Sequence, residues 1–267
     1  MADTRGIYLN EILRQYGLES LSDWAHEAII NDWSQEQFVI ELYKRPEFQK
    51  RFAGMFQLEA NKRPPISVEE YLAYERAIHA QAAMWGMTLE KDLVDQMIGN
   101  EVSNVEAQGR FDLAAEAMYE SDDETIAELM RMSNVQSGDI MLYFMNPKEE
   151  YGKLQNSFRQ AQIAGAAMRT GWGQLSQIQA QRLQETGMTR EQSMVGFGEL
   201  ARMGEALKPF ALSEDVITEE DQVEFLAGDV VAAQKIEGRI RSRLAEFEGS
   251  GGFAAGEGGF AVGAAES

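Results

Sequence analysis

The residue types that most often carry chemistry are scarce in this chain. It holds two histidines, His26 and His79, and no cysteine, which argues against histidine-rich metal sites and histidine-based triads and excludes cysteine nucleophiles. Glu75 and His79 lie four residues apart and would share a helix face. Two ligands do not make a metal site, however, and an ion pair is the commoner use of this spacing. We therefore expect no metal and no catalytic histidine.

Acidic residues gather in two short stretches, 121–124 and 213–221. Both lack the alternating oxygen ligands, central glycine and terminal glutamate of a calcium-binding loop. They are typical instead of helix starts, where carboxylates meet the positive end of the helix dipole. The one dense basic patch, Arg239, Arg241 and Arg243, favours a self-compensated helix face over a nucleic-acid footprint, because Glu237 can pair with Arg241.

Cofactor motifs are absent from the sequence. No phosphate-binding loop occurs, and Gly171-Trp172-Gly173 lacks the strand context and the third glycine of a dinucleotide fingerprint. Carboxylates are abundant, but the sequence places no pair at the separation that a glycosidase needs. We expect no cofactor and no enzymatic activity.

The chain is strongly acidic, with 44 acidic against 24 basic residues and a formal net charge of −20. Such a charge repels a phosphate backbone and an anionic membrane surface. It leaves two interpretations open, a solvated surface that resists aggregation or recognition of a basic partner. The first residues lack the order of a signal peptide, and no apolar run approaches the length of a spanning helix. We therefore expect neither feature.

Helix starts recur along the chain as a capping residue followed three positions later by an acid or amide. The pairs are Ser67 with Glu70, Ser103 with Glu106, and Thr189 with Gln192. From Ser67, apolar positions keep a spacing of three or four up to Trp85, which predicts one long amphipathic helix. The other predicted helices span 6–16, 22–31, 34–44, 88–98, 103–120, 123–132, 138–145, 147–169, 175–186, 189–207, 218–226 and 229–247. The fold class is all-α, an array of about a dozen short to medium helices with a glycine-rich flexible tail.

Two breaks divide this array. Residues 61–65 hold a proline pair that interrupts helices, and Pro209 opens a second break. The sequence thus predicts an N-terminal helical unit over 1–63, a main body over 66–207, an acidic linker with a two-helix extension over 208–247, and a Gly/Phe/Ala-rich tail over 248–267. Pro147 is expected in the first turn of its helix.

Two features are candidates for docking other proteins. Ala161 and Gly165 place small residues four apart on a helix, which allows either close packing inside the chain or a subunit interface. In the tail, Phe253 and Phe260 are candidate anchors of a strip that orders on assembly, and a merely disordered tail is the alternative.

Five segments spread over most of the chain carry a family resemblance: Ser22–Ala25 with Trp24, Arg45–Phe52, Ser67–Tyr71, Phe158–Ala167 and Ala245–Gly249. They resemble a group of virion proteins encoded by tailed bacteriophages, of the minor tail or internal virion type. The five segments are packing and turn motifs, so the resemblance implies a virion component without transferring an active site.

The resemblance and the serial helices together predict a structural or assembly component of a tailed-phage virion. It would be made in the host cytoplasm and reside in the virion, at the tail or inside the head near the portal channel. Its partners would be other virion proteins, with copies of itself as a further option. Two alternatives stay open: a transient scaffold or chaperone, and a cell-wall hydrolase that acts at genome entry.

Overall fold

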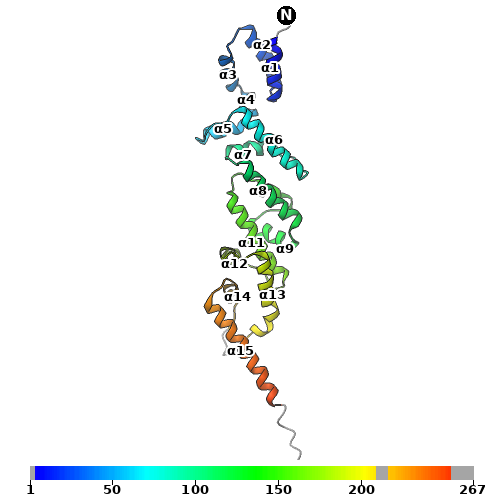
Figure 1. Cartoon of the computed structure of the whole chain (residues 1–267), viewed down its shortest axis with the longest axis vertical. Helices are drawn as coiled ribbons and strands as arrows, with labels where there is room; N and C mark the ends of the chain where they lie inside the picture. Colours follow the sequence, from blue (N-terminus) through cyan, green and yellow to red (C-terminus); the bar gives the residue numbers. More distant parts are fainter. Residues whose placement is uncertain (1–3, 209–215, 254–267) are drawn as a thin grey trace, which may run out of the picture. The chain divides into compact units, whose positions relative to one another are not determined.

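The structure is a computed structural model that describes residues 4–208 and 216–253. Within these ranges the chain forms fifteen α-helices and no strand, which confirms the all-α prediction (Figure 1). The chain divides into two compact units. The first unit comprises residues up to Glu116 together with Gly138–Leu154, and the second comprises Ala117–Ser137 and the residues from Gln155 onward. The first unit is thus built from two separate stretches of chain.

The helices of the first unit begin close to the predicted positions. They are α1 (Thr4–Gln15), α2 (Ser22–Ile30), α3 (Gln35–Tyr43), α4 (Pro46–Arg51), α5 (Ala53–Ala60), α6 (Val68–Met84), α7 (Lys91–Gly99), α8 (Asn104–Ala115) and α10 (Ile140–Met145). Helix α6 carries the predicted capping box between Ser67 and Glu70. Helices α4 and α5 were not predicted, although Pro46 stands in the first turn of α4, where proline is favoured.

The second unit contains the remaining helices. They are α9 (Asp123–Ser133), α11 (Tyr151–Arg169, whose first turn belongs to the first unit), α12 (Gln177–Glu185), α13 (Arg190–Leu207), α14 (Glu219–Leu226) and α15 (Val230–Phe253). The predicted end of the last helix at 247 is wrong, because α15 continues to Phe253. Extending an existing helix adds one hydrogen bond for each residue fixed, and this offsets the poor propensity of the glycines.

The unit boundaries differ from the breaks expected at 63–66 and 207–208. Residues 61–65 do interrupt the helices, but α5 and α6 on either side of them share one core, to which Phe52, Leu58 and Tyr71 all belong. The chain instead leaves the first unit where α8 passes into a single π-helical turn, Glu116–Glu120, which continues the predicted 103–120 helix with a different hydrogen-bond pattern.

Each unit has its own apolar core. In the first unit, the Phe48, Phe52 and Tyr71 rings lie in a row, with 4.8 Å between the first two ring centres and 5.0 Å between the last two. In the second unit, Trp172 packs on Phe197 at 4.9 Å. Aromatic pairs at these separations add to the stabilisation that area burial already gives.

Arg110, a residue of α8, binds the second stretch of the first unit through hydrogen bonds. Its side chain is 1% exposed, and its guanidinium donates to the backbone carbonyls of Phe144 (3.1 Å), Asn146 (2.8 Å) and Glu149 (2.6 Å). The Glu106 carboxylate accepts two further hydrogen bonds from it, at 2.9 and 2.7 Å. A buried guanidinium is tolerated because all of its N–H positions face acceptors.

This contact also explains why the expected position of Pro147 is wrong. Residues 146–150 form a turn before α11 rather than its first helical turn. In a helix, the carbonyls of Asn146 and Glu149 would be directed along the helix axis toward other amides. In the turn both accept hydrogen bonds from Arg110, and the Asn146 carbonyl also accepts one from the Glu149 amide at 3.2 Å.

Arg110→Met should lower the free energy of unfolding of the chain by about 3–5 kcal/mol, since removing one partner of a buried polar set leaves the others unpaired. Arg14→Met is the matched control, because Arg14 is 68% exposed and pairs only with Glu11 on its own helix. Chemical denaturation followed by circular dichroism measures both. Equal effects of the two substitutions would contradict the role given to Arg110.

Candidate protein-docking surface

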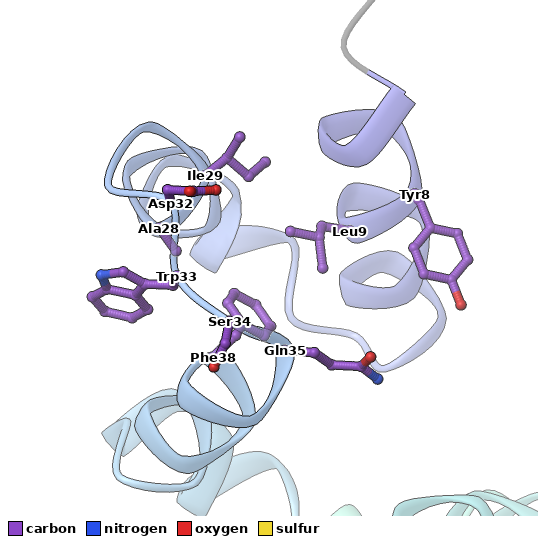
Figure 2. Close-up of a pocket in the computed structure, with 9 residues that line it drawn as sticks. All are labelled: Tyr8, Leu9, Ala28, Ile29, Asp32, Trp33, Ser34, Gln35 and Phe38. Carbon is purple, nitrogen blue, oxygen red and sulfur yellow. The ribbon is translucent and has the colours of Figure 1, made fainter.

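An open groove lies in the first unit between α1 and the segment that joins α2 to α3. Its volume is about 500 Å³, and it is lined by Tyr8, Leu9, Ala28, Ile29, Asp32, Trp33, Ser34, Gln35 and Phe38. Figure 2 shows Leu9 pointing from α1 toward the ring of Phe38, whereas Tyr8 points away on the outer side of α1. The walls are therefore mainly apolar, and Asp32 carries the one charge among the lining residues.

The floor of this groove is held by an aromatic cluster. Trp24 stacks on Phe38 with ring centres 4.8 Å apart, and Trp33 meets Trp24 edge-on at 5.8 Å. The Arg45 guanidinium lies 4.7 Å from the centre of the Trp24 ring, a distance at which the cation is attracted to the ring. Trp24 and Arg45 thus help to shape this surface.

Backbone geometry at the edge of the groove depends on Asp32. This residue has a φ of 54°, in the left-handed region that only glycine, asparagine and aspartate adopt readily. It ends α2 and turns the chain so that Ser34 can cap α3 by accepting a hydrogen bond from the Gln37 amide at 3.1 Å. The turn brings α3 back beside α1.

Exposed apolar side chains are frequent on α1, α2 and α3, the helices that form this groove. The part of the chain that the structure describes has eighteen large apolar side chains at the surface, and six lie between residues 7 and 43: Ile7, Tyr8, Ile30, Val39, Ile40 and Tyr43. Isolated exposed apolar residues are ordinary on protein surfaces, but a cluster beside a groove is typical of an interaction site. This surface is our candidate for protein docking.

The predicted docking residues Ala161 and Gly165 are placed elsewhere, inside the second unit. Ala161 is fully buried, and Gly165 is buried against the start of α9. A Cβ added at Gly165 would lie 2.6 Å from Oγ1 and 2.7 Å from the backbone nitrogen of Thr125. Within this chain, the small residues therefore serve close packing between α11 and α9.

Phe253 ends α15, and Phe260 lies outside the described residues. Their role as docking anchors stays a prediction. The groove between α1 and α3 was not predicted from the sequence, because its residues come from three helices whose mutual packing no local pattern encodes.

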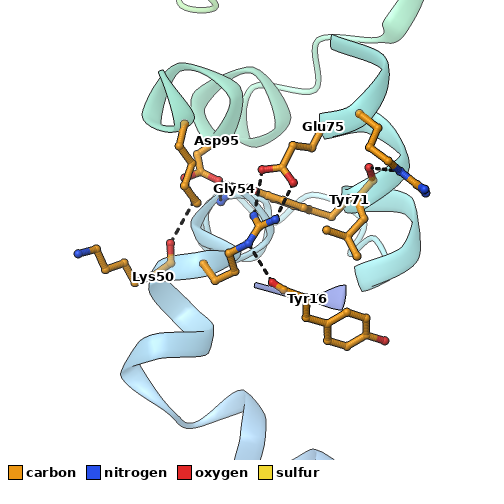
Figure 3. A network of polar contacts seen from close by, with 10 residues as sticks. Tyr16, Lys50, Gly54, Tyr71, Glu75 and Asp95 are labelled. Atoms are coloured by element: carbon orange, nitrogen blue, oxygen red, sulfur yellow. Dashed lines mark hydrogen bonds and ion pairs between the residues drawn. The ribbon is translucent and has the colours of Figure 1, made fainter. Parts of the chain in front are cut away.

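Buried polar groups elsewhere in the first unit form a network that could be mistaken for a catalytic site. Figure 3 shows Asp95 where α5, α6 and α7 meet. Its carboxylate, 5% exposed, accepts hydrogen bonds from the Tyr71 hydroxyl, from Lys91 and from the Gly54 amide. Burial and this carboxylate raise the pKa of Tyr71 well above its usual range, which keeps the hydroxyl protonated as a donor.

In the same network, Glu75 of the expected Glu75 and His79 pair binds Arg51. Glu75 accepts two hydrogen bonds from Arg51, at 3.0 and 2.6 Å, and Arg51 also donates to the Tyr16 carbonyl at 3.0 Å (Figure 3). Glu75 is thus engaged with a cation from α4 in a forked ion pair. Among the residues that the structure describes, no three His, Asp or Glu side chains come together as metal ligands.

In the second unit, the acidic stretch at 121–124 opens a helix, as predicted. Asp122 caps α9 by accepting from the Thr125 amide at 2.8 Å, and it also binds Arg169 at 3.0 Å and Arg190. Burial acts to raise the pKa of the Asp122 carboxyl, but the hydrogen bonds from Arg190 and Thr125 outweigh it and hold the pKa well below its usual range. This carboxylate joins three helices and is a structural group.

The second acidic stretch is used in the same way over its described part. Thr218 and Asp221 form a capping box at the start of α14, while Ser213–Asp215 lie outside the described residues. Burial would raise the pKa of Asp221, but the hydrogen bonds from Lys235 and Thr218 lower it to about 2. The predicted pair of Glu237 with Arg241 is confirmed at 3.1 Å.

No protein-family model, no curated protein and no solved structure matches this chain. None of the helices in residues 4–208 and 216–253 has both the length and the apolar character that crossing a membrane requires.

Acid should weaken the second unit through Asp122 and Asp221. Because their pKa values in the folded chain lie below the ordinary value of 3.8, their contribution is complete above that pH and is lost as the pH falls toward 2. Asp122→Asn keeps a capping side chain but removes the charge, so it should lower stability at pH 7 and flatten the loss between about pH 4 and 2. Urea denaturation at several pH values measures the free energy of unfolding of this variant and of the control Glu199→Gln, which changes an exposed side chain. An identical pH dependence in the two variants would contradict the role given to Asp122.

Gly165→Ala should destabilise the chain by about 1–3 kcal/mol, since the added methyl overlaps backbone atoms of Thr125. Gly204→Ala in α13 is the matched control, because nothing lies within 4 Å of its added Cβ. There, alanine should stabilise the helix by up to about 1 kcal/mol. Thermal unfolding compares the two. A neutral Gly165→Ala would mean that this helix face is free to serve a partner.

Proposed function

We propose that this chain is a non-enzymatic structural component of a tailed-phage virion that acts through protein–protein contacts. The contact role is carried by one observation, an open and mainly apolar groove formed by α1, α2 and α3, helices that also carry six exposed apolar side chains. The phage setting comes from the resemblance of the sequence segments given above. The site in the virion is the tail or the interior of the head near the portal channel.

The state of the buried charges supports a non-enzymatic role. Asp95 and Glu128 are almost fully buried and bind the side chains of Lys91 and Arg131. Glu128 also accepts from Gln174 at 2.9 Å. A general acid or base must reach its substrate with a free lone pair or proton, whereas these groups are enclosed among structural partners.

A transient assembly factor is the second candidate, and the net charge of −20 favours it. A highly charged protein stays soluble and monomeric until it meets an oppositely charged surface. Both candidates depend on protein contacts, and they differ in whether the chain remains in the finished particle.

Mass spectrometry of purified, protease-washed particles of the phage that encodes the chain should detect it in mature virions at a constant copy number. A structural component resists removal because its contacts are buried in the particle. Presence in precursor particles with loss on maturation would identify an assembly factor instead. Absence from both kinds of particle would refute the virion proposal.

A further inference from the structure

The groove surface continues along α3 beyond the residues that line it. Gln35, Val39 and Tyr43 are spaced four residues apart, so they fall on one stripe of α3. Val39 is 43% and Tyr43 39% exposed, and Gln35 lines the groove. The apolar surface is therefore elongated in the direction of a helix, which is the shape that helix-in-groove recognition uses.

The charge around this surface is predominantly acidic. Residues 4–45 contain seven carboxylates, Glu11, Glu19, Asp23, Glu27, Asp32, Glu36 and Glu41, against the four cations Arg5, Arg14, Lys44 and Arg45. Lys44 pairs with Glu41 at 2.7 Å, and Arg45 lies over the Trp24 ring. Arg14 is engaged with Glu11 at 2.9 Å. Asp32 lines the groove, and Glu27 and Glu36 directly adjoin the lining residues Ala28 and Gln35. An apolar groove with an acidic rim attracts a segment that combines apolar anchors with cations.

The same charge argues against other occupants. A second copy of this surface would bring its own acidic rim against the first, and like charges in an interface cost binding free energy. The tail over 249–267 carries Glu257 and Glu266 with no lysine or arginine, so it is repelled as well. Nucleic acid and anionic lipid are disfavoured for the same reason.

We infer that the groove between α1 and α3 binds an amphipathic helix of a different protein, one whose apolar anchors are flanked by lysine or arginine. This inference deepens the contact role in the proposed function and rests on it, but not on the virion setting. The anchors of the incoming helix would occupy the space between Leu9 and Phe38. Its cations would face Glu27, Asp32 and Glu36.

The test uses the full chain and two model peptides of about 18 residues, long enough to form helix on binding. Both peptides carry Leu and Phe at helical spacing, and they differ only in having Lys and Arg or Glu at the remaining positions. Fluorescence anisotropy of labelled peptide measures Kd. The basic peptide should bind at least about 100-fold more tightly than the acidic one, and the preference should shrink as salt rises from about 50 to 500 mM.

Paired substitutions separate the groove from general acidity. Leu9→Ser with Val39→Ser should weaken binding of the basic peptide about ten-fold or more, because Leu9 points into the groove and Val39 extends its apolar surface along α3. Ile178→Ser with Val195→Ser removes two exposed apolar side chains from the second unit, and it should leave Kd unchanged. Circular dichroism verifies that each variant stays folded.

A second variant tests the contribution of charge and combines Glu27→Gln, Asp32→Asn and Glu36→Gln. Asparagine is chosen at Asp32 because it tolerates the left-handed backbone there. This variant should reduce both the affinity for the basic peptide and its salt dependence. The control replaces three exposed carboxylates elsewhere, Glu59, Glu149 and Glu199, by glutamine and should have a smaller effect.

The inference is overturned if groove and control variants weaken binding equally, if the acidic peptide binds as well as the basic one, or if a peptide of residues 249–267 binds more tightly than either. Failure of this test leaves incorporation into particles to be decided by mass spectrometry. Conversely, absence of the chain from particles leaves the peptide affinities as they are. The two proposals therefore fail separately.

Discussion

The first unit depends on one buried guanidinium. Arg110 is the group through which residues 144–149, which follow an excursion of the chain into the second unit, are held against α8. A single side chain donates to three backbone carbonyls, those of Phe144, Asn146 and Glu149. Their desolvation is compensated only while Arg110 keeps its Glu106 counter-charge. A discontinuous unit is stable here because one residue serves both stretches of chain.

The spacing of Ser103 and Glu106 predicts a capping box, but the Glu106 side chain makes a different contact that the local sequence does not reveal. The pairs Ser67 with Glu70 and Thr189 with Gln192 form full capping boxes, as their spacing predicts. Ser103 likewise caps its helix by accepting from the Glu106 amide, but the Glu106 carboxylate turns to Arg110 instead of returning to the cap. A buried cation outcompetes an exposed amide for a carboxylate, because the charge-assisted bond is the stronger one in a low dielectric.

The fold class followed from helical periodicity and capping, since both are local. The site did not, because Leu9, Ala28 and Phe38 meet only after three helices have packed. Helices α4 and α5 were missed for a related reason. Phe48 of α4 and Phe52, the residue between the two helices, belong to an aromatic row completed by Tyr71 from α6. Short helices of this kind are stabilised by tertiary packing more than by their own periodicity.

Acidity and apolar exposure have opposite effects on association, and their combination on α1–α3 makes recognition selective. An exposed apolar cluster by itself attracts any other apolar surface, copies of the same chain included. Surrounding it with carboxylates adds a repulsive term against every acidic surface, including its own, and leaves attraction for cationic partners. With a net charge of −20, the chain is repelled from other copies of itself at long range. In the proposed recognition, the groove between α1 and α3 is the surface that meets partners of opposite charge.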